Sequence, residues 1–158
     1  MDEQPEQSNE PPPETCVTIQ CEFALDVKWL ETKVKEALLC LGRDNSLISV
    51  AVVNDETMSE LHLQHSGIEG TTDVLTFDHG GVENTIDADI AVCIDVALRS
   101  AETRAHSVES ELLLYTLHGI LHCMGFDDHD NNSHQKIHTE EDRVLQAIGV
   151  GAIWSNGK

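Results

Sequence analysis

The chain has 158 residues and a formal net charge of −20, from 29 Asp and Glu against 9 Lys and Arg. This length suits one domain with its own core, and a hydrophobic content of 40% excludes a wholly disordered chain. The acidic balance argues against a protein that holds nucleic acid through its overall charge, because phosphate binding depends on Lys and Arg.

The first 14 residues are rich in Pro and acidic side chains and lack hydrophobic periodicity, so we predict a disordered acidic tail over residues 1–14. The tail has neither the basic region nor the apolar region of a secretory signal. No apolar run approaches the ~20 residues of a membrane span. We interpret the five cysteines as reduced, mostly buried thiols. These features predict a cytoplasmic protein with no membrane partner.

Helical and strand periodicities divide the rest of the chain into alternating segments. The first four are a strand within 15–25, a helix from Asp26 to Gly42, a buried strand at 47–53 and a helix from Asn54 or Asp55 to about His65. The others are strands at 72–77 and 87–94 joined at Gly80-Gly81, then helices capped by Asp95, from Ser107 to Gly125, and from about Ser133 to Ala147. Short strands interleaved with helices indicate a single α+β or α/β domain over residues 15–150.

The clearest chemical signal is the segment HGILHCMGFDDH, from His118 to His129. His118 and His122 are four residues apart on a predicted helix, so both rings lie on one face and can share an ion. Gly125 can supply a left-handed turn that folds the chain back, and His129 is then the natural third ligand. Three neutral imidazoles with an open fourth position are typical of a catalytic zinc site.

The residue after His118 distinguishes this segment from the H-E-x-x-H metalloproteases, whose glutamate is the general base. Here that position is Gly119, so a peptide-cleaving activity lacks its base. Glycine in the middle of a helix costs ~1 kcal/mol relative to alanine. Gly119 therefore predicts a close approach of backbone or substrate to the helix.

Other polar residues carry weaker signals. His134 and His138 repeat the four-residue spacing on the last helix, but their polar neighbours favour an exposed face. We interpret His106, at a helix junction, as structural. Asp127 could either orient a ligand histidine or belong to an ordinary turn.

Three sequence blocks occur in a recognisable order and spacing. They are TDVLTF at residues 72–77, ADIAV at residues 88–92 and HGILHCMGFD at residues 118–127. Together they resemble the YbeY family of metal-dependent endoribonucleases, whose motifs are T-D-V-L-S-F, G-D-I-x-I and H-G-x-L-H-x-x-G-[YF]-D-H. The resemblance covers roughly residues 46–147.

The resemblance implies a zincin-like α+β fold, in which a small mixed sheet packs with helices and the helix that carries the histidines is central. It implies one zinc per chain, held by His118, His122 and His129. It also implies hydrolysis of single-stranded RNA, with a role in 16S rRNA 3′-end maturation and ribosome quality control. The implied partners are single-stranded ribosomal RNA and the small ribosomal subunit or its proteins.

The chain departs from the family pattern at two places. Asp128 occupies the register of the family's third histidine, so it is the alternative ligand. Ser66 stands where the family has an arginine, whose guanidinium would bind phosphate. His65 or Arg104 could compensate, and Thr76 keeps the hydroxyl of the family's serine. The alternative function is a metal-binding, ribosome-associated module with little or no nuclease activity.

Overall fold

The computed structural model describes residues 15–153. Its strands are β1 (Cys16–Gln20), β2 (Leu47–Val53), β3 (Val74–Asp78) and β4 (Asp87–Cys93). Its helices are α2 (Val27–Cys40), α3 (Asp55–Ser66), α4 (Ile94–Arg104), α5 (Val108–Cys123) and α6 (Asn131–Ala147). The predicted elements are present in the predicted order, and the predicted tail over 1–14 lies outside the described residues.

The strands form one mixed sheet in the order β1-β2-β4-β3. β1 pairs with β2, and β2 with β4, in the parallel direction. The chain passes through α2 between β1 and β2, and through α3 and β3 between β2 and β4, so each parallel pair is joined by a crossover that contains a helix. β3 pairs with β4 in the antiparallel direction, with Thr76 opposite Ile90. A mixed sheet with helices packed against it is the α+β arrangement that the sequence predicted.

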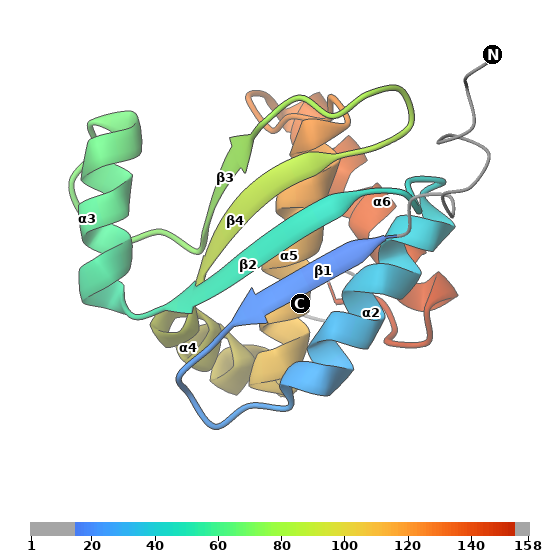
Figure 1. Cartoon of the computed structure of the whole chain (residues 1–158). Helices are drawn as coiled ribbons and strands as arrows, with labels where there is room; N and C mark the ends of the chain where they lie inside the picture. The colour runs from blue at the N-terminus through green and yellow to red at the C-terminus, as the bar shows by residue number, and fades with distance from the viewer. Residues whose placement is uncertain (1–14, 154–158) are drawn as a thin grey trace, which may run out of the picture.

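The helices cover the two faces of the sheet unequally (Figure 1). α2, α5 and α6 lie behind the sheet, and α3 stands apart at the other side, next to β3 and β4. Alternate residues of the central strands, such as Ile48, Val50, Ile90 and Val92, enter the core that the sheet shares with the helices behind it. The face toward α3 is open, and a groove of about 420 Å³ crosses it.

Helix α5 lies at the centre of the fold. Ten of its residues are buried, because α2, α4, α6 and the sheet all pack around it. Its apolar sequence serves this packing. Among residues 15–153 no helix has both the length and the apolar character that crossing a membrane requires.

Side-chain caps explain where most helices begin. Asp26, Asn54 and Ser107 each accept a hydrogen bond from a backbone N–H in the first turn. The sequence placed helix starts at Asp26 and Ser107, and of the two candidates Asn54 and Asp55 it is Asn54 that caps. The prediction for Asp95 was wrong: α4 begins at Ile94 without a side-chain cap, and the Asp95 carboxylate instead accepts the backbone N–H of Asp55 at 2.8 Å.

Three further predictions need correction. β1 ends at Gln20, well before the predicted limit of its strand. α6 begins two residues before Ser133, because Asp130 caps it by accepting the Ser133 N–H. The thiols are less buried than predicted: Cys93 is buried, Cys16 is exposed and the other three are half-buried.

Candidate metal centre

Two histidines on α5 bring their ring nitrogens together. His118 and His122 are one helical turn apart, and their Nε2 atoms are 3.0 Å from each other. Both side chains are partly buried, with exposed fractions of 18% and 32%. The helical spacing thus places two imidazoles on one face, as the sequence predicted, where both can contact one ion.

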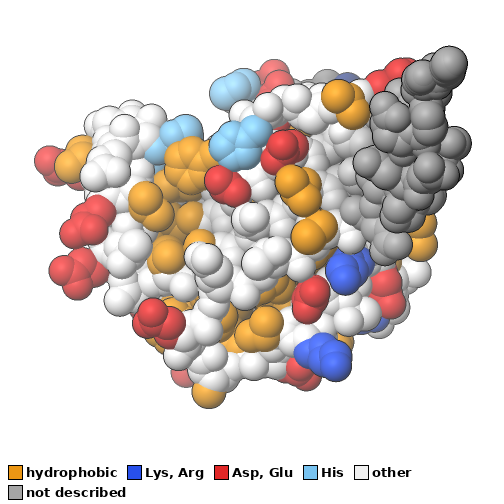
Figure 2. Space-filling model, viewed as in Figure 1, with side chains coloured by type: hydrophobic (Ala, Val, Ile, Leu, Met, Phe, Trp, Pro, Cys, Tyr) orange, Lys and Arg blue, Asp and Glu red, His pale blue; other side chains and the backbone are white. Residues whose placement is uncertain are grey.

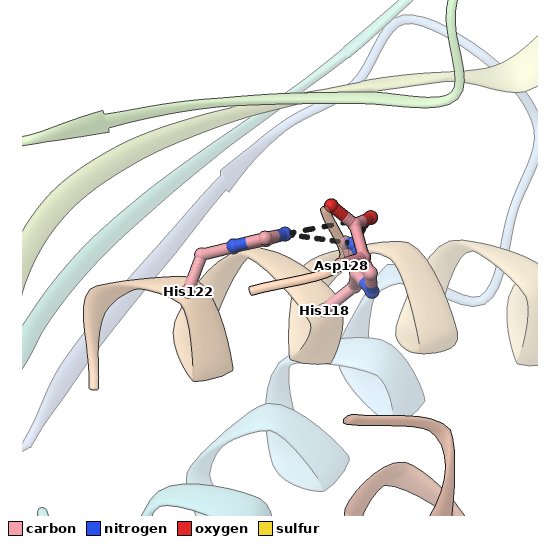
Figure 3. Close-up of side chains that lie close together, drawn as sticks. All are labelled: His118, His122 and Asp128. Carbon is pink, nitrogen blue, oxygen red and sulfur yellow. Dashed lines mark hydrogen bonds and ion pairs between the residues drawn. The ribbon is translucent and has the colours of Figure 1, made fainter. Parts of the chain in front are cut away.

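The turn after α5 returns the chain to these histidines. Gly125 has a φ of 102°, and the N–H of Phe126 donates to the carbonyl of Leu121 at 3.1 Å, so the chain reverses tightly at the helix end. Asp128 then faces the pair (Figure 3). Its Oδ2 lies 3.4 Å from His118 Nε2 and 4.0 Å from His122 Nε2.

These three atoms have a geometry that suits one metal ion. The point equidistant from atoms at these separations lies about 2 Å from each, within the range of zinc–nitrogen and zinc–oxygen bonds (~2.0–2.2 Å). Two imidazoles and a carboxylate are a ligand set that zinc accepts in catalytic sites. His118, His122 and Asp128 could therefore hold such an ion.

His129 is placed differently. It is exposed, and its backbone N–H donates a long hydrogen bond of 3.4 Å to Asp127 Oδ1. The ligand atoms that lie within 4.8 Å of one another belong to His118, His122 and Asp128, and His129 is not among them. The Asp127 carboxylate thus supports the turn, and the ligand role of His129 stays a prediction.

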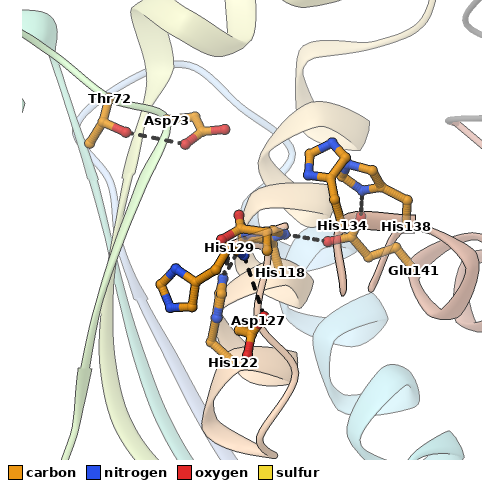
Figure 4. Close-up of polar contacts among 10 residues, drawn as sticks. Thr72, Asp73, His118, His122, Asp127, His129, His134, His138 and Glu141 are labelled. Atoms are coloured by element: carbon orange, nitrogen blue, oxygen red, sulfur yellow. Dashed lines mark hydrogen bonds and ion pairs between the residues drawn. The ribbon is translucent and has the colours of Figure 1, made fainter. Parts of the chain in front are cut away.

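A buried carboxylate on α6 orients His118. Glu141 is fully buried, its Oε2 accepts the Nδ1–H of His118, and its Oε1 accepts the Nδ1–H of His138 at 2.9 Å (Figure 4). Because the carboxylate can only accept, the proton of neutral His118 is held on Nδ1. The Nε2 lone pair is left facing His122 and Asp128, which is the protonation state that metal binding needs.

The pKa values of this group follow from burial and from Glu141. Burial lowers the pKa of His118, but the hydrogen bond and charge of Glu141 outweigh burial and raise it overall. Burial and the neighbouring charge of His118 lower the pKa of His122. Burial acts to raise the pKa of Glu141, yet the hydrogen bonds from His118 and His138 bring it below its usual value.

A second group of possible ligand atoms, Asp55, Cys93 and Asp95, lies where the start of α3 meets the junction of β4 and α4. Arg99 forms a bidentate contact with Asp55 at 2.9 and 3.2 Å, and Asp95 accepts the backbone N–H of Asp55. The Arg99 hydrogen bonds hold the pKa of Asp55 at about 2. These contacts explain why the three side chains lie close together without a metal ion: they join the start of α3 to α4.

The sequence model of the family described as Endoribonuclease YbeY matches residues 18–149. The chain belongs to the YbeY family. A relative from Frankia alni named Endoribonuclease YbeY is 33% identical over 123 residues, which are 70% of this chain and 68% of that protein. One of the same name from Symbiobacterium thermophilum is 30% identical over 142 residues, which are 82% of this chain and 91% of that protein.

A solved structure has the same fold. The solution structure of TM1509 from Thermotoga maritima superposes with a TM-score of 0.57 and 24% sequence identity, over 84% of this chain and 90% of that chain. At this identity the likeness concerns the fold alone. The YbeY resemblance found in the sequence is confirmed by the family match.

Two of the predicted substrate-contact residues lie beside the histidine-bearing helix. Thr76 on β3 faces α5: a Cβ on Gly119 would lie 2.5 Å from its Oγ1, so the close neighbour of the helix is a side chain of the sheet, where the sequence predicted backbone or substrate. Arg104, at the end of α4, lines a cavity of about 220 Å³ together with His118 and Asp128. Its Nη1 is also 3.6 Å from the buried carboxylate of Glu111.

The end of α3 is where YbeY proteins, by the sequence resemblance, carry an arginine. His65 packs edge-on against the ring of Phe77, with ring centroids 4.6 Å apart. Phe77 is next to Thr76 on β3 and therefore points to the opposite face of the sheet. His65 is thus separated by β3 from the metal group, and Ser66, the last residue of α3, is exposed.

Sequence reasoning missed Glu141 and misplaced His138. We expected an exposed face for His138, but its side chain is only 16% exposed because it turns inward to Glu141. A signal was present: Glu141 lies in the apolar stripe of α6 with Ile137, Val144 and Leu145, all buried. A carboxylate in such a stripe needs a partner. His106 likewise contacts a buried carboxylate, Glu111, in keeping with a structural role.

Proposed function

We propose that this YbeY-family chain is a zinc-dependent endoribonuclease, specific for single-stranded RNA, with a zincin-like fold. We propose that it acts in the cytoplasm, in 16S rRNA 3′-end maturation and ribosome quality control, on ribosomal RNA of the small subunit. The observation that carries the proposal is the convergence of His118, His122 and Asp128 within 4.8 Å, where His118 and Asp128 also line a cavity.

The proposed ligands are His118, His122 and one residue of the turn after α5. The position of Asp128 Oδ2 favours Asp128 as the third ligand. His129, the ligand implied by the resemblance, is the alternative, and separate alanine substitutions at the two positions distinguish them. The variant that loses zinc identifies the ligand.

The chain's own residues supply orientation and substrate contacts. Zinc bound here would lower the pKa of a coordinated water toward ~7 and so provide hydroxide at neutral pH. Glu141 keeps the His118 ring in its ligating tautomer. Arg104 offers a charge to a phosphate in the cavity, and Thr76 offers a hydroxyl next to Gly119. His65 lies across β3 from the metal group, so it could contact only a part of the RNA that extends past this edge strand.

The test compares zinc content and RNA cleavage in the same preparations. Wild type should contain about one tightly bound zinc, cleave single-stranded ribosomal RNA fragments and leave the matching duplexes intact. A chelator and His122→Ala should each abolish cleavage, whereas His79→Gln, which changes an exposed histidine of the β3–β4 loop, should retain it. Cleavage that persists in His122→Ala would refute the proposal.

The chain's charge favours a second candidate, a metal-binding and ribosome-associated module with little nuclease activity. Figure 2 shows acidic side chains at several places on the open face of the sheet and few Lys or Arg. Ser66 provides no guanidinium where the family has one. A zinc-loaded protein that binds small ribosomal subunits without cleaving RNA would favour the module.

A Ser66→Arg variant tests whether a guanidinium at the end of α3 reaches the phosphate of the substrate. An added guanidinium can form paired hydrogen bonds to phosphate, and a charged hydrogen bond of ~1.5–3 kcal/mol corresponds to roughly tenfold to 150-fold faster cleavage. Ser66→Gln, which adds a polar side chain without charge, is the matched control. Equal rates in wild type and Ser66→Arg would place Ser66 away from the phosphate.

A further inference from the structure

A second pair of histidines, on α6, repeats the geometry of the pair on α5. His134 and His138 are four residues apart, and their Nε2 atoms are 2.9 Å from each other. The corresponding Nε2 separation of His118 and His122 is 3.0 Å. In both pairs the two rings meet edge to face, with centroids 4.1 and 4.5 Å apart.

Glu141 connects the two pairs. One of its oxygens accepts the Nδ1–H of His118, and the other accepts the Nδ1–H of His138 (Figure 4). The same argument that fixes the tautomer of His118 therefore applies to His138: its proton is on Nδ1, and the Nε2 lone pair points to His134. A carboxylate behind a ligating histidine is the usual support of a metal site.

The space in front of His134 and His138 can hold the remaining ligands of an ion. Both histidines line the 220 Å³ cavity that also contacts His118 and Asp128. A water molecule occupies about 30 Å³ in the liquid, so this volume admits several waters. Among the residues that line the cavity, the carboxylates of Asp73, Asp128 and Glu141 outnumber the one guanidinium, that of Arg104, so the local charge favours a cation.

We propose that His134 and His138 form a second binding site for a divalent transition-metal ion such as Zn²⁺, with waters of the cavity completing its coordination. Two imidazole nitrogens 2.9 Å apart can both lie ~2.0–2.1 Å from one ion. This site is distinct from the proposed catalytic zinc, because its ligands are on α6 and on the other side of Glu141. Its ion adds positive charge to a cavity that has one guanidinium.

A direct hydrogen bond between the two rings is the competing explanation. His134 could donate Nε2–H to the Nε2 lone pair of His138, and the same short distance would result without an ion. The two explanations differ in the number of metal ions that the protein binds. They also differ in whether added Zn²⁺ changes the NMR resonances of the two Nε2 atoms.

The experiment titrates Zn²⁺ into metal-free full-length protein by calorimetry, with equilibrium dialysis and elemental analysis to count bound ions. We expect two ions per wild-type chain and one in His134→Gln, which changes an exposed side chain. We expect one ion in His122→Ala, because the site on α6 remains. The control His79→Gln should bind two.

One ion per wild-type chain would overturn the inference, and so would two ions in His134→Gln. In wild type, the Nε2 resonances of His134 and His138 in nitrogen-15 NMR should shift with the second equivalent of Zn²⁺; unchanged resonances would equally refute it. RNA cleavage is not part of this test. A wild type that binds two ions and cuts no RNA would contradict the proposed nuclease and leave the second site standing.

Discussion

Adding a single methyl group at Gly119 tests how closely α5 approaches the sheet. The Cβ of a Gly119→Ala variant would lie 2.5 Å from Thr76 Oγ1 and 3.3 and 3.4 Å from two methyl carbons of Ile90. A real Cβ does not tolerate the first contact, so the Thr76 side chain, the helix or the strand must shift. Overpacking of this kind costs ~1–3 kcal/mol, while replacing a helical glycine by alanine returns ~1 kcal/mol. We expect Gly119→Ala to lower the free energy of unfolding by up to about 2 kcal/mol.

Two substitutions at Thr76 separate the contact from other effects. Thr76→Ala removes the clashing oxygen, whereas Thr76→Val keeps an atom of similar size in its place. Gly119→Ala should therefore cost much less in the Thr76→Ala background than in the Thr76→Val background. The coupling is measured as a double-mutant cycle from urea unfolding by linear extrapolation.

Equal costs of Gly119→Ala in both backgrounds would show that Thr76 does not limit the approach of α5. An alanine variant more stable than wild type by ~1 kcal/mol, which is the full gain from replacing a helical glycine, would refute the close approach altogether. In that case Gly119 would have to be explained by contact with substrate.

Three further predictions concern the buried carboxylate, a thiol and a helix end. Glu141→Gln leaves one acceptor oxygen, so only one of the two histidines can keep donating its Nδ1–H; zinc affinity should fall ~10–100-fold in competition with a coloured chelator, and unchanged affinity would contradict the role of Glu141. Burial, together with the charge of Asp78, raises the pKa of Cys123 to about 11; since the thiolate is the reactive form, iodoacetamide at pH 8 should modify Cys123 far more slowly than exposed Cys16, and mass spectrometry of the peptides would reveal comparable rates if this is wrong. Ala105 ends α4 with a φ of 60°, which costs a residue with a Cβ ~1–2 kcal/mol; Ala105→Gly should raise the free energy of urea unfolding by roughly 0.5–1 kcal/mol after the added entropy of the unfolded chain, and a decrease would count against this backbone strain.

The parts of this protein that follow from local periodicity were readable in the sequence. The β-branched run of β2 and the four-residue spacing of His118 and His122 each depend on a single element, so the pattern alone predicts them. The N-cap of α4 was mispredicted because Asp95 has a tertiary partner, the backbone of Asp55. An aspartate that caps its own helix and one that accepts a hydrogen bond from another element cannot be distinguished from the sequence alone.

The third ligand position and the carboxylate behind His118 were beyond the reach of local reasoning. Whether Asp128 or His129 faces the histidines depends on the conformation of the turn after Gly125. A shift of one residue along this turn would put His129 in the place that Asp128 occupies. Glu141 is 23 residues from His118 along the chain. Its place in an apolar stripe indicates burial, but only the packing of α6 against α5 determines which histidines it meets.

The strand order has a consequence for how the protein is made. β4 lies between β2 and β3 in the sheet, yet it is the last of these strands to be synthesised. A nascent chain that has emerged only as far as residue 86 has a β2 edge without its neighbour and a β3 without the strand that it pairs with in the described sheet. Such unpaired edges are prone to association with other chains. Glu141 is contributed by α6, which follows α5 in the chain, so the support of His118 forms only after α6 has also been synthesised. A polypeptide released before β4 is synthesised would therefore expose strand edges that associate with other chains, and it would lack both the histidines of α5 and the carboxylate that orients His118.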